Sequence, residues 1–234
     1  MAQDRARTEA DVANLALAEL GEPPIAALTD NVARARVVAA LFGTARDDAL
    51  RAYDWAFATR WLKPPALATL STGPLQYRFP MPDSCLRVRF LTDASIASAA
   101  GTATLDPDDM PEFPWDIEAP EEFDGQVAPA AVVVVTNVTT PWICYTTRVT
   151  NPTQWDTEFV KAFAKTLAGM AAPQIMKDPA RVEAIQNRAA DELATAGLDN
   201  SREGAPKTVS RDVSWVRARR VGVAYRPAYR DTGD

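Results

Sequence analysis

The order of helical and extended patterns along the chain constrains its fold more than any other feature. Apolar residues recur at helical spacing in two stretches near the start and in two more after residue 150, whereas the region between them shows short extended stretches. Strands that are contiguous in sequence can pair among themselves, so the central region is predicted to form a small antiparallel β lobe. The flanking helices are expected to close on one another as a four-helix bundle. The predicted fold class is therefore α+β, with an extended C-terminal arm.

Two helices are predicted within residues 1–61. Thr8, with Asp11 three residues later, has the pattern of a capping box, and Gly21, followed by two prolines, predicts the end of the first helix. The apolar stripe of this helix is Val12, Leu15, Ala16 and Leu20. A second, longer helix is predicted to begin at Thr29 and Asp30 and to end near the aromatic residues before residue 62. Its apolar face is Val38, Leu41, Phe42, Ala45, Ala49 and Ala52.

The β lobe is predicted within residues 62–150. Residues 76–79 look extended, and the alternation of Leu86, Val88 and Phe90 with two arginines predicts a half-buried strand. A short strand is predicted at 115–118, inside a region rich in turn formers and acids. Residues 132–138 and 142–149 are expected to complete one small sheet, joined to each other by a turn through 137–141.

Two further helices are predicted within residues 151–198. Thr153 is the predicted N-cap of the third helix, with Asp156 reaching back to the cap amide. Its apolar spacing is given by Phe159, Phe163, Leu167 and Met170. Asp178 followed by Pro179 predicts the start of the fourth helix, and Gly197 its end. Its buried stripe is predicted to be Val182, Ile185, Ala189 and Leu193.

Composition argues against several classes of function. The chain has no histidine, which removes the commonest general base and the commonest metal ligand. The formal net charge of -6 is unlike that of a general nucleic-acid-binding domain. Cys85 and Cys144 are predicted to be buried free thiols rather than a disulfide, as in a reducing cytoplasm. We find no signal peptide and no run of eighteen apolar residues, so no membrane association is expected.

Two groups of acids suggest chemistry, and in both a simpler interpretation is favoured. A calcium loop would need the spacing and internal glycine of an EF-hand, which the first group lacks, so a solvated acidic loop is expected there. The second group could be imagined as a glycosidase pair, but carboxylates without a cleft do not support that reaction. We predict no catalytic residue and no cofactor. The two groups are Asp106, Asp108, Asp109 and Glu112, and Glu121, Glu122 and Asp124.

The C-terminal arm, residues 199–234, combines basic and aromatic residues without a periodic apolar pattern. Residues 205–230 contain seven Lys or Arg and one Asp. Ordering such a segment costs on the order of 1–2 kcal/mol per residue, so a partner surface would have to offset a large sum. The arm could dock into a crevice of another protein, bind DNA or remain disordered, and its spaced aromatics favour docking. The predicted contact residues are Trp215, Arg217, Arg219, Arg220, Tyr225, Arg226, Tyr229 and Arg230.

Several of these segments together resemble the head-to-tail adaptors of tailed phages. The group is the tail tubular protein A type, which has relatives among gene transfer agents. The resemblance covers residues 8–198 and is weakest between 93 and 129, where residues 119–125 intervene after the Ile117-Glu118 strand. The segments that carry it are residues 12–25, 47–51, 55–60, 79–88, 117–118, Tyr145 and 149–164.

The resemblance implies a structural protein rather than an enzyme. It implies a homo-oligomeric ring, dodecameric in relatives, in the virion neck between the capsid portal and the tail, assembled in the cytoplasm of a bacterial host. The arm would then contact the portal protein, the opposite face would receive a downstream tail or stopper protein, and genomic DNA would pass through the lumen. An acidic body would let DNA slide through without binding. Alternatives are another neck component, such as a stopper or head completion protein, a DNA-binding protein that uses the basic arm, or a cell-wall hydrolase.

Overall fold

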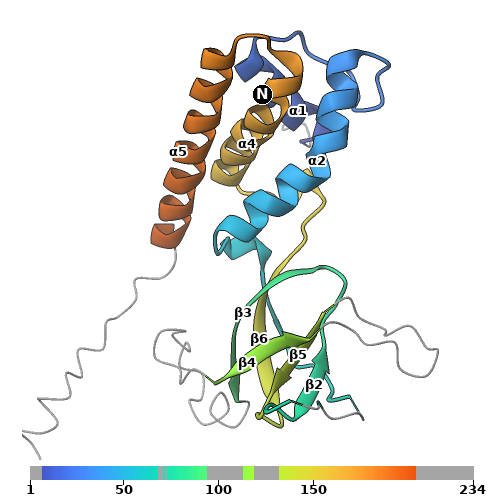
Figure 1. The fold of residues 1–234 in the computed structure, drawn as a ribbon, viewed down its shortest axis with the longest axis vertical. Helices are drawn as coiled ribbons and strands as arrows, with labels where there is room; N and C mark the ends of the chain where they lie inside the picture. The colour runs from blue at the N-terminus through green and yellow to red at the C-terminus, as the bar shows by residue number, and fades with distance from the viewer. Residues whose placement is uncertain (1–6, 68–70, 72, 94–112, 119–131, 204–234) are drawn as a thin grey trace, which may run out of the picture. The chain divides into compact units, whose positions relative to one another are not determined.

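The computed structural model describes residues 7–67, 71, 73–93, 113–118 and 132–203 (Figure 1). All of these residues belong to one compact unit, residues 1–204. Their fold is α+β, with four α-helices and two three-stranded antiparallel sheets among the described residues. The helices are α1 (Glu9–Leu20), α2 (Ala33–Ala52), α4 (Thr157–Ile175) and α5 (Pro179–Glu203), and short 3-10 turns occupy η1 (Ala56–Ala58) and η3 (Pro152–Gln154). Both acidic groups considered above lie outside the described residues.

Helix α1 has the ends that the sequence predicts. The Thr8 hydroxyl accepts a hydrogen bond from the Asp11 amide, and the Asp11 carboxylate accepts one from the Thr8 amide at 2.8 Å, so the capping box is confirmed. Gly21 ends the helix with φ 75°, in the left-handed region that glycine adopts without strain. The predicted burial of Leu15 is wrong, because 49% of its surface is exposed. It lies opposite the buried stripe, which is Val12, Ala13, Ala16, Leu17 and Leu20.

Helix α2 is shorter at both ends than predicted. Its N-cap is Val32, and the Asp30 carboxylate instead accepts hydrogen bonds from the Ala26 and Ala27 amides, which stabilises the preceding turn. The helix ends at Ala52, which is exposed. The aromatic residues that we placed near its end therefore belong to η1 and the first strand, and the buried apolar face near the C-terminus includes Leu50 rather than Ala52.

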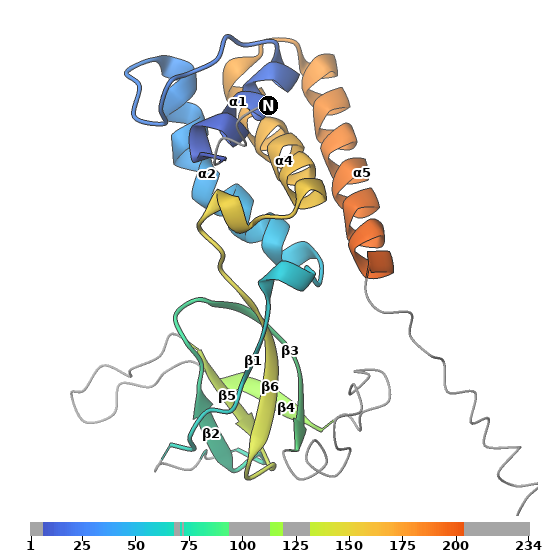
Figure 2. The same ribbon diagram turned by 180° about the vertical axis from the view of Figure 1, so that it is seen from behind.

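The strands form two sheets rather than the single sheet predicted. The first sheet has the order β1 (Thr59–Leu62), β6 (Pro141–Thr147), β3 (Cys85–Asp93), and the second has the order β2 (Tyr77–Pro80), β5 (Val133–Thr136), β4 (Trp115–Glu118) (Figure 2). Strands β5 and β6, which we expected to pair as neighbours, are the central strands of different sheets. At the start of their connection, the Asn137 side chain accepts a hydrogen bond from the Gln76 amide, which holds it beside β2.

The two sheets share one hydrophobic core. All four residues of β5 are buried, so it shows no alternation. Irregular pairing within β3, between Val88 and Phe90, also breaks the alternation predicted there. This sheet core consists of Phe79, Met81, Val88, Leu91, Val134, Val138, Ile143 and Tyr145.

Helix α4 contacts α1, α2 and α5, and it contributes Phe159 and Phe163 to the helical core (Figures 1 and 2). Its N-cap is Asp156, whose carboxylate accepts a hydrogen bond from the Glu158 amide at 2.7 Å. The predicted N-cap, Thr153, lies instead in η3, which Asn151 caps. Phe159, Phe163 and Leu167 are fully buried as predicted.

Helix α5 begins where the sequence predicts, but it does not end at Gly197. Pro179 occupies its first position, and the Asp178 carboxylate accepts a hydrogen bond from the Ala180 amide. The helix continues to Glu203, so residues 199–203, which we assigned to the extended arm, are helical. Gly197 is required for another reason, because a Cβ at this position would overlap the ring of Tyr53.

Candidate functional site

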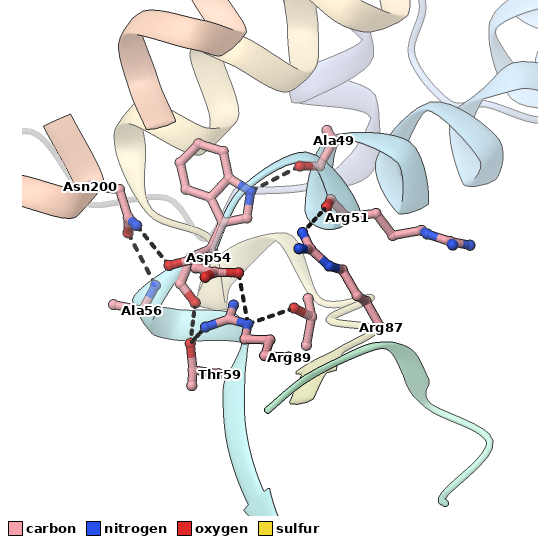
Figure 3. Close-up of polar contacts among 10 residues, drawn as sticks. Ala49, Arg51, Asp54, Ala56, Thr59, Arg87, Arg89 and Asn200 are labelled. Carbon is pink, nitrogen blue, oxygen red and sulfur yellow. Dashed lines mark hydrogen bonds and ion pairs between the residues drawn. The ribbon is translucent and has the colours of Figure 1, made fainter. Parts of the chain in front are cut away.

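The predicted contact residues of the arm cannot be placed. Trp215, Arg217, Arg219, Arg220, Tyr225, Arg226, Tyr229 and Arg230 all lie outside the described residues. Within the described part of the chain, polar side chains gather where α2 passes into β1. Residues from β3 and from the last turn of α5 meet this connection, which we call the junction cluster, comprising Asp54, Thr59, Arg89, Thr146 and Asn200 (Figure 3).

Arg89 lies at the centre of the junction cluster, with 8% of its side chain exposed. Its Nε atom is 3.0 Å from the Asp54 carboxylate and donates to the Thr146 hydroxyl at 3.0 Å, while Nη1 donates to the Thr59 hydroxyl at 2.8 Å. The third nitrogen, Nη2, is buried without a hydrogen-bond partner. Burial lowers the pKa of Arg89, and the nearby Asp54 carboxylate opposes that shift. Removing a remaining partner of this buried guanidinium would leave its charge less compensated and would lower the stability of the fold.

Asn200 joins α5 to the same connection through two hydrogen bonds. Its Nδ2 donates to the Asp54 carbonyl at 2.8 Å, and its Oδ1 accepts from the Ala56 amide at 3.1 Å (Figure 3). Both partners are backbone groups that no helix or strand uses, so one amide side chain satisfies a donor and an acceptor of the linker at once. The last turn of α5 is therefore bound to the segment that leads into β1.

Two further arginines connect the helices to the strands. Arg87 of β3 donates to the Arg51 carbonyl at 3.2 Å, near the C-terminal end of α2, where carbonyl groups lack helical partners (Figure 3). Arg148, just after β6, is 2.8 Å from the Asp47 carboxylate of α2, which also binds Arg46. The Arg87 contact places positive charge at the C-terminal end of α2, where the helix dipole favours cations.

Two buried tryptophans hold the ends of the helical core in the same manner. The indole of Trp55 donates to the Ala49 carbonyl and that of Trp155 to the Val149 carbonyl, each at 2.9 Å and each six residues back. Both rings contact Phe159 edge to face, with centroid separations of 5.1 and 5.5 Å. Trp55 and Trp155 are therefore packing residues of the helical core.

Cys85 lies on β3, the strand that carries Arg89, and Cys144 lies on its pairing partner β6. Cys85 and Cys144 are both free, as predicted, with Cys144 buried and Cys85 half-buried. Burial raises the pKa of each thiol to about 11, against a smaller opposing effect of Arg89 on Cys144 and of the Arg87 backbone on Cys85. Both thiols are therefore protonated and unreactive near neutral pH.

The described surface also carries apolar features that could meet other molecules. The most exposed large apolar side chains are Leu15, Trp61, Ile117 and Leu198. A shallow apolar groove of about 280 Å³ lies between α4 and α5. Its lining residues are Thr166, Gly169, Met170, Gln186, Ala189, Ala190 and Leu193.

The junction cluster offers hydrogen bonding and charge but none of the pairings that catalysis requires. Its carboxylate is bound to a guanidinium, and its hydroxyls already accept hydrogen bonds from Arg89. Within the described ranges we find no group of acidic and cysteine side chains that could hold a metal ion. Among the described helices, none combines the length and apolarity of a membrane span. The arrangement is suited to holding segments of the chain together.

Sequence reasoning missed the junction cluster. Arg89 was interpreted only through strand alternation, and Asn200 was assigned to the C-terminal arm. One signal was available, since Asn200 follows the predicted end of a helix by only three residues, where a polar side chain can reach a neighbouring segment. Comparison with protein-family models and with curated proteins finds no match to this sequence.

Proposed function

We propose that this chain is a structural head-to-tail adaptor of a tailed phage or a phage-like particle. Copies would form a ring below the portal, join the capsid to the tail and leave a channel for DNA. In this proposal the four helices act as a bundle that forms the ring wall, and the C-terminal arm contacts the portal. The chain has no enzymatic role in this proposal, because its contribution is mechanical.

The observation that supports the proposal is where the segments that resemble adaptors lie in the structure. Residues 12–25, 47–51, 55–60 and 149–164 are far apart in the sequence, yet all contribute to one hydrophobic core. Tyr145 and residues 79–88 contribute to the sheet core. Six of the seven segments that resemble adaptors therefore contribute to the two hydrophobic cores. The seventh, residues 117–118, lies in β4, where Ile117 is 50% exposed.

Surface features also suit contacts between copies. The groove between α4 and α5 is lined by small and apolar side chains, which allow close approach of another helix. Leu198 lies further along α5 and is 58% exposed. A ring wall built from helices would bury such features between neighbouring subunits, and each arm's modest affinity for the portal would be multiplied by simultaneous engagement around the ring.

The deciding experiment measures association with the portal protein of the same particle. Full-length chain and assembled portal would be mixed, and their complex followed by sedimentation velocity and electron microscopy. We expect a ring of this chain on one end of the portal. Deletion of residues 209–234 is expected to abolish association while leaving helical content unchanged by circular dichroism. Full association without those residues would exclude the arm as the portal contact.

Matched arm variants separate protein docking from DNA binding. Replacing Trp215, Tyr225 and Tyr229 by Ala should weaken portal association strongly, because buried aromatics dominate protein interfaces. Replacing Arg217, Arg219 and Arg220 by Ala should weaken it less and should alter its dependence on salt. A chain that binds duplex DNA with steep salt dependence and shows no portal binding would favour the DNA-binding alternative instead.

A further inference from the structure

The last turn of α5 is anchored at the connection between the helices and the first sheet. Three contacts produce this arrangement. Asn200 binds the Asp54 carbonyl and the Ala56 amide, and Gly197 lies against the ring of Tyr53. Tyr53 in turn contacts Trp55 edge to face, with ring centroids 6.2 Å apart. The last turn of α5, from which the chain continues into residues 204–234, is therefore tied to the linker between α2 and β1.

The same linker is tied to the first sheet by different atoms. The Asp54 carboxylate is 3.0 Å from Nε of Arg89 in β3, while the Asp54 carbonyl is occupied by Asn200. Thr59, the first residue of β1, donates its hydroxyl to the Trp55 carbonyl and accepts from Arg89. Asp54 thus lies between two partners, one on α5 and one on β3 (Figure 3).

We propose that Asn200 is a latch that couples the base of the C-terminal arm to the first sheet through Asp54 and Arg89. While Asn200 keeps its hydrogen bonds, the last turn of α5, the linker and the start of β1 unfold locally as one unit. When these hydrogen bonds are broken, each segment unfolds locally on its own. Its bonds are solvent-accessible side-chain to backbone bonds, so the latch is weak enough to open without unfolding the core. The latch is a property of the isolated chain, and only its use during assembly rests on the proposed function.

When a partner binds the arm, the latch is expected to transmit the effect to the first sheet. A partner that orders or pulls the arm acts first on the last turn of α5, since the arm continues directly from it. Through the latch, that action reaches β1 and β3. Coupling between two sites is reciprocal, so a change at the sheet must also alter the end of α5. This reciprocity distinguishes a latch from a contact that only stabilises its own neighbourhood.

Hydrogen exchange of the full-length chain, followed by mass spectrometry, tests the proposal in both directions. Asn200→Ala should raise exchange roughly tenfold in peptides covering 56–62 and 85–93, since two hydrogen bonds are lost. Asp54→Asn keeps the carbonyl that Asn200 uses but weakens the bond to Arg89, and it should raise exchange at 198–203. Asn200→Asp retains an acceptor for the Ala56 amide and should have an intermediate effect.

Asn187→Ala is the matched control, because Asn187 is an exposed asparagine on the same helix. It should leave exchange in all three peptides unchanged. The proposal is overturned if Asn200→Ala loosens only the end of α5, if Asp54→Asn leaves residues 198–203 unchanged, or if the control has the same effect. Circular dichroism verifies that each variant retains its helices. If the unmodified chain does not bind the portal but its variants show the expected changes in exchange, the proposed function is contradicted and the latch proposal stands.

Discussion

At the scale of single residues, substituting two helical glycines is expected to change the free energy of unfolding in opposite directions. Gly197 lies against Tyr53, so Gly197→Ala must displace the ring and should lower the free energy of unfolding by about 1–3 kcal/mol. Gly43 in α2 has open space at the same position, so Gly43→Ala should raise it by up to about 1 kcal/mol through helix propensity. Urea denaturation of the two variants measures both effects. Equal and stabilising effects would show that the Tyr53 contact does not form.

The buried thiols predict a loss of stability at alkaline pH. Burial raises the pKa of Cys85 and Cys144 from 9.0 to about 11, so the folded chain holds these protons where the unfolded chain releases them. The free energy of unfolding should therefore be unaffected below pH 9 and should fall between pH 9 and 11. Urea denaturation across this range should show a shallower fall for the Cys85→Ala, Cys144→Ala double variant. Identical slopes would mean that the thiols do not contribute.

Individual side chains show where sequence patterns reach their limit. Thr8, Asp11, Gly21 and Pro179 were predicted correctly because helix ends depend on local backbone geometry. The burial of Leu15 was predicted wrongly, because periodicity defines a stripe but not which neighbouring element covers it. Contacts between distant segments decide that question.

At the scale of elements, two variants distinguish Asp156 from Thr153 as the N-cap of α4. Asp156→Ala removes the acceptor for the Glu158 amide and should cost about 0.5–2 kcal/mol of stability. Thr153→Ala removes a side chain that only bonds Asn151, at an exposed position, and should change stability by less than about 0.5 kcal/mol. Thermal denaturation compares the two variants. A larger loss from Thr153→Ala would restore the assignment made from the sequence.

The strands were easier to predict than their pairing. Strands β2, β3, β4, β5 and β6 were all anticipated approximately, because β-branched and aromatic runs mark extended segments. Strand β1 was missed, since four residues after a helix carry little periodic signal. The division into two sheets was also missed, because pairing between segments far apart in sequence leaves no local pattern.

At the scale of the whole molecule, the two hydrophobic cores should respond separately to substitution. Ile143 belongs to the sheet core and Ile185 to the helical core, and both are buried. Each Ile→Val change should cost about 0.5–1.5 kcal/mol. Hydrogen exchange should rise mainly in β1, β3 and β6 for Ile143→Val, because Ile143 pairs with Leu62 and Leu91, and mainly in α4 and α5 for Ile185→Val. Equal loosening of both regions by either variant would mean that the cores open as one.

The candidate site was the least predictable level. The junction cluster brings together residues separated by more than a hundred positions, with Asn200 bonded to Asp54 and Ala56. Its members are ordinary polar residues in unremarkable local sequence, so only the folded arrangement identifies them. The arm, in contrast, was conspicuous from composition alone, although its residues 204–234 lie outside the described part of the chain.

The position of α4 and β6 late in the chain has a consequence for synthesis. Helices α1 and α2 bury their apolar faces against α4, and among the described strands β1 and β3 pair only with β6. A nascent chain leaving the ribosome therefore cannot complete the first sheet before Thr147 emerges, nor the helical core before Ala196 emerges. Until then the apolar faces of α1 and α2 lack part of their native partners, which is the condition under which chaperones bind.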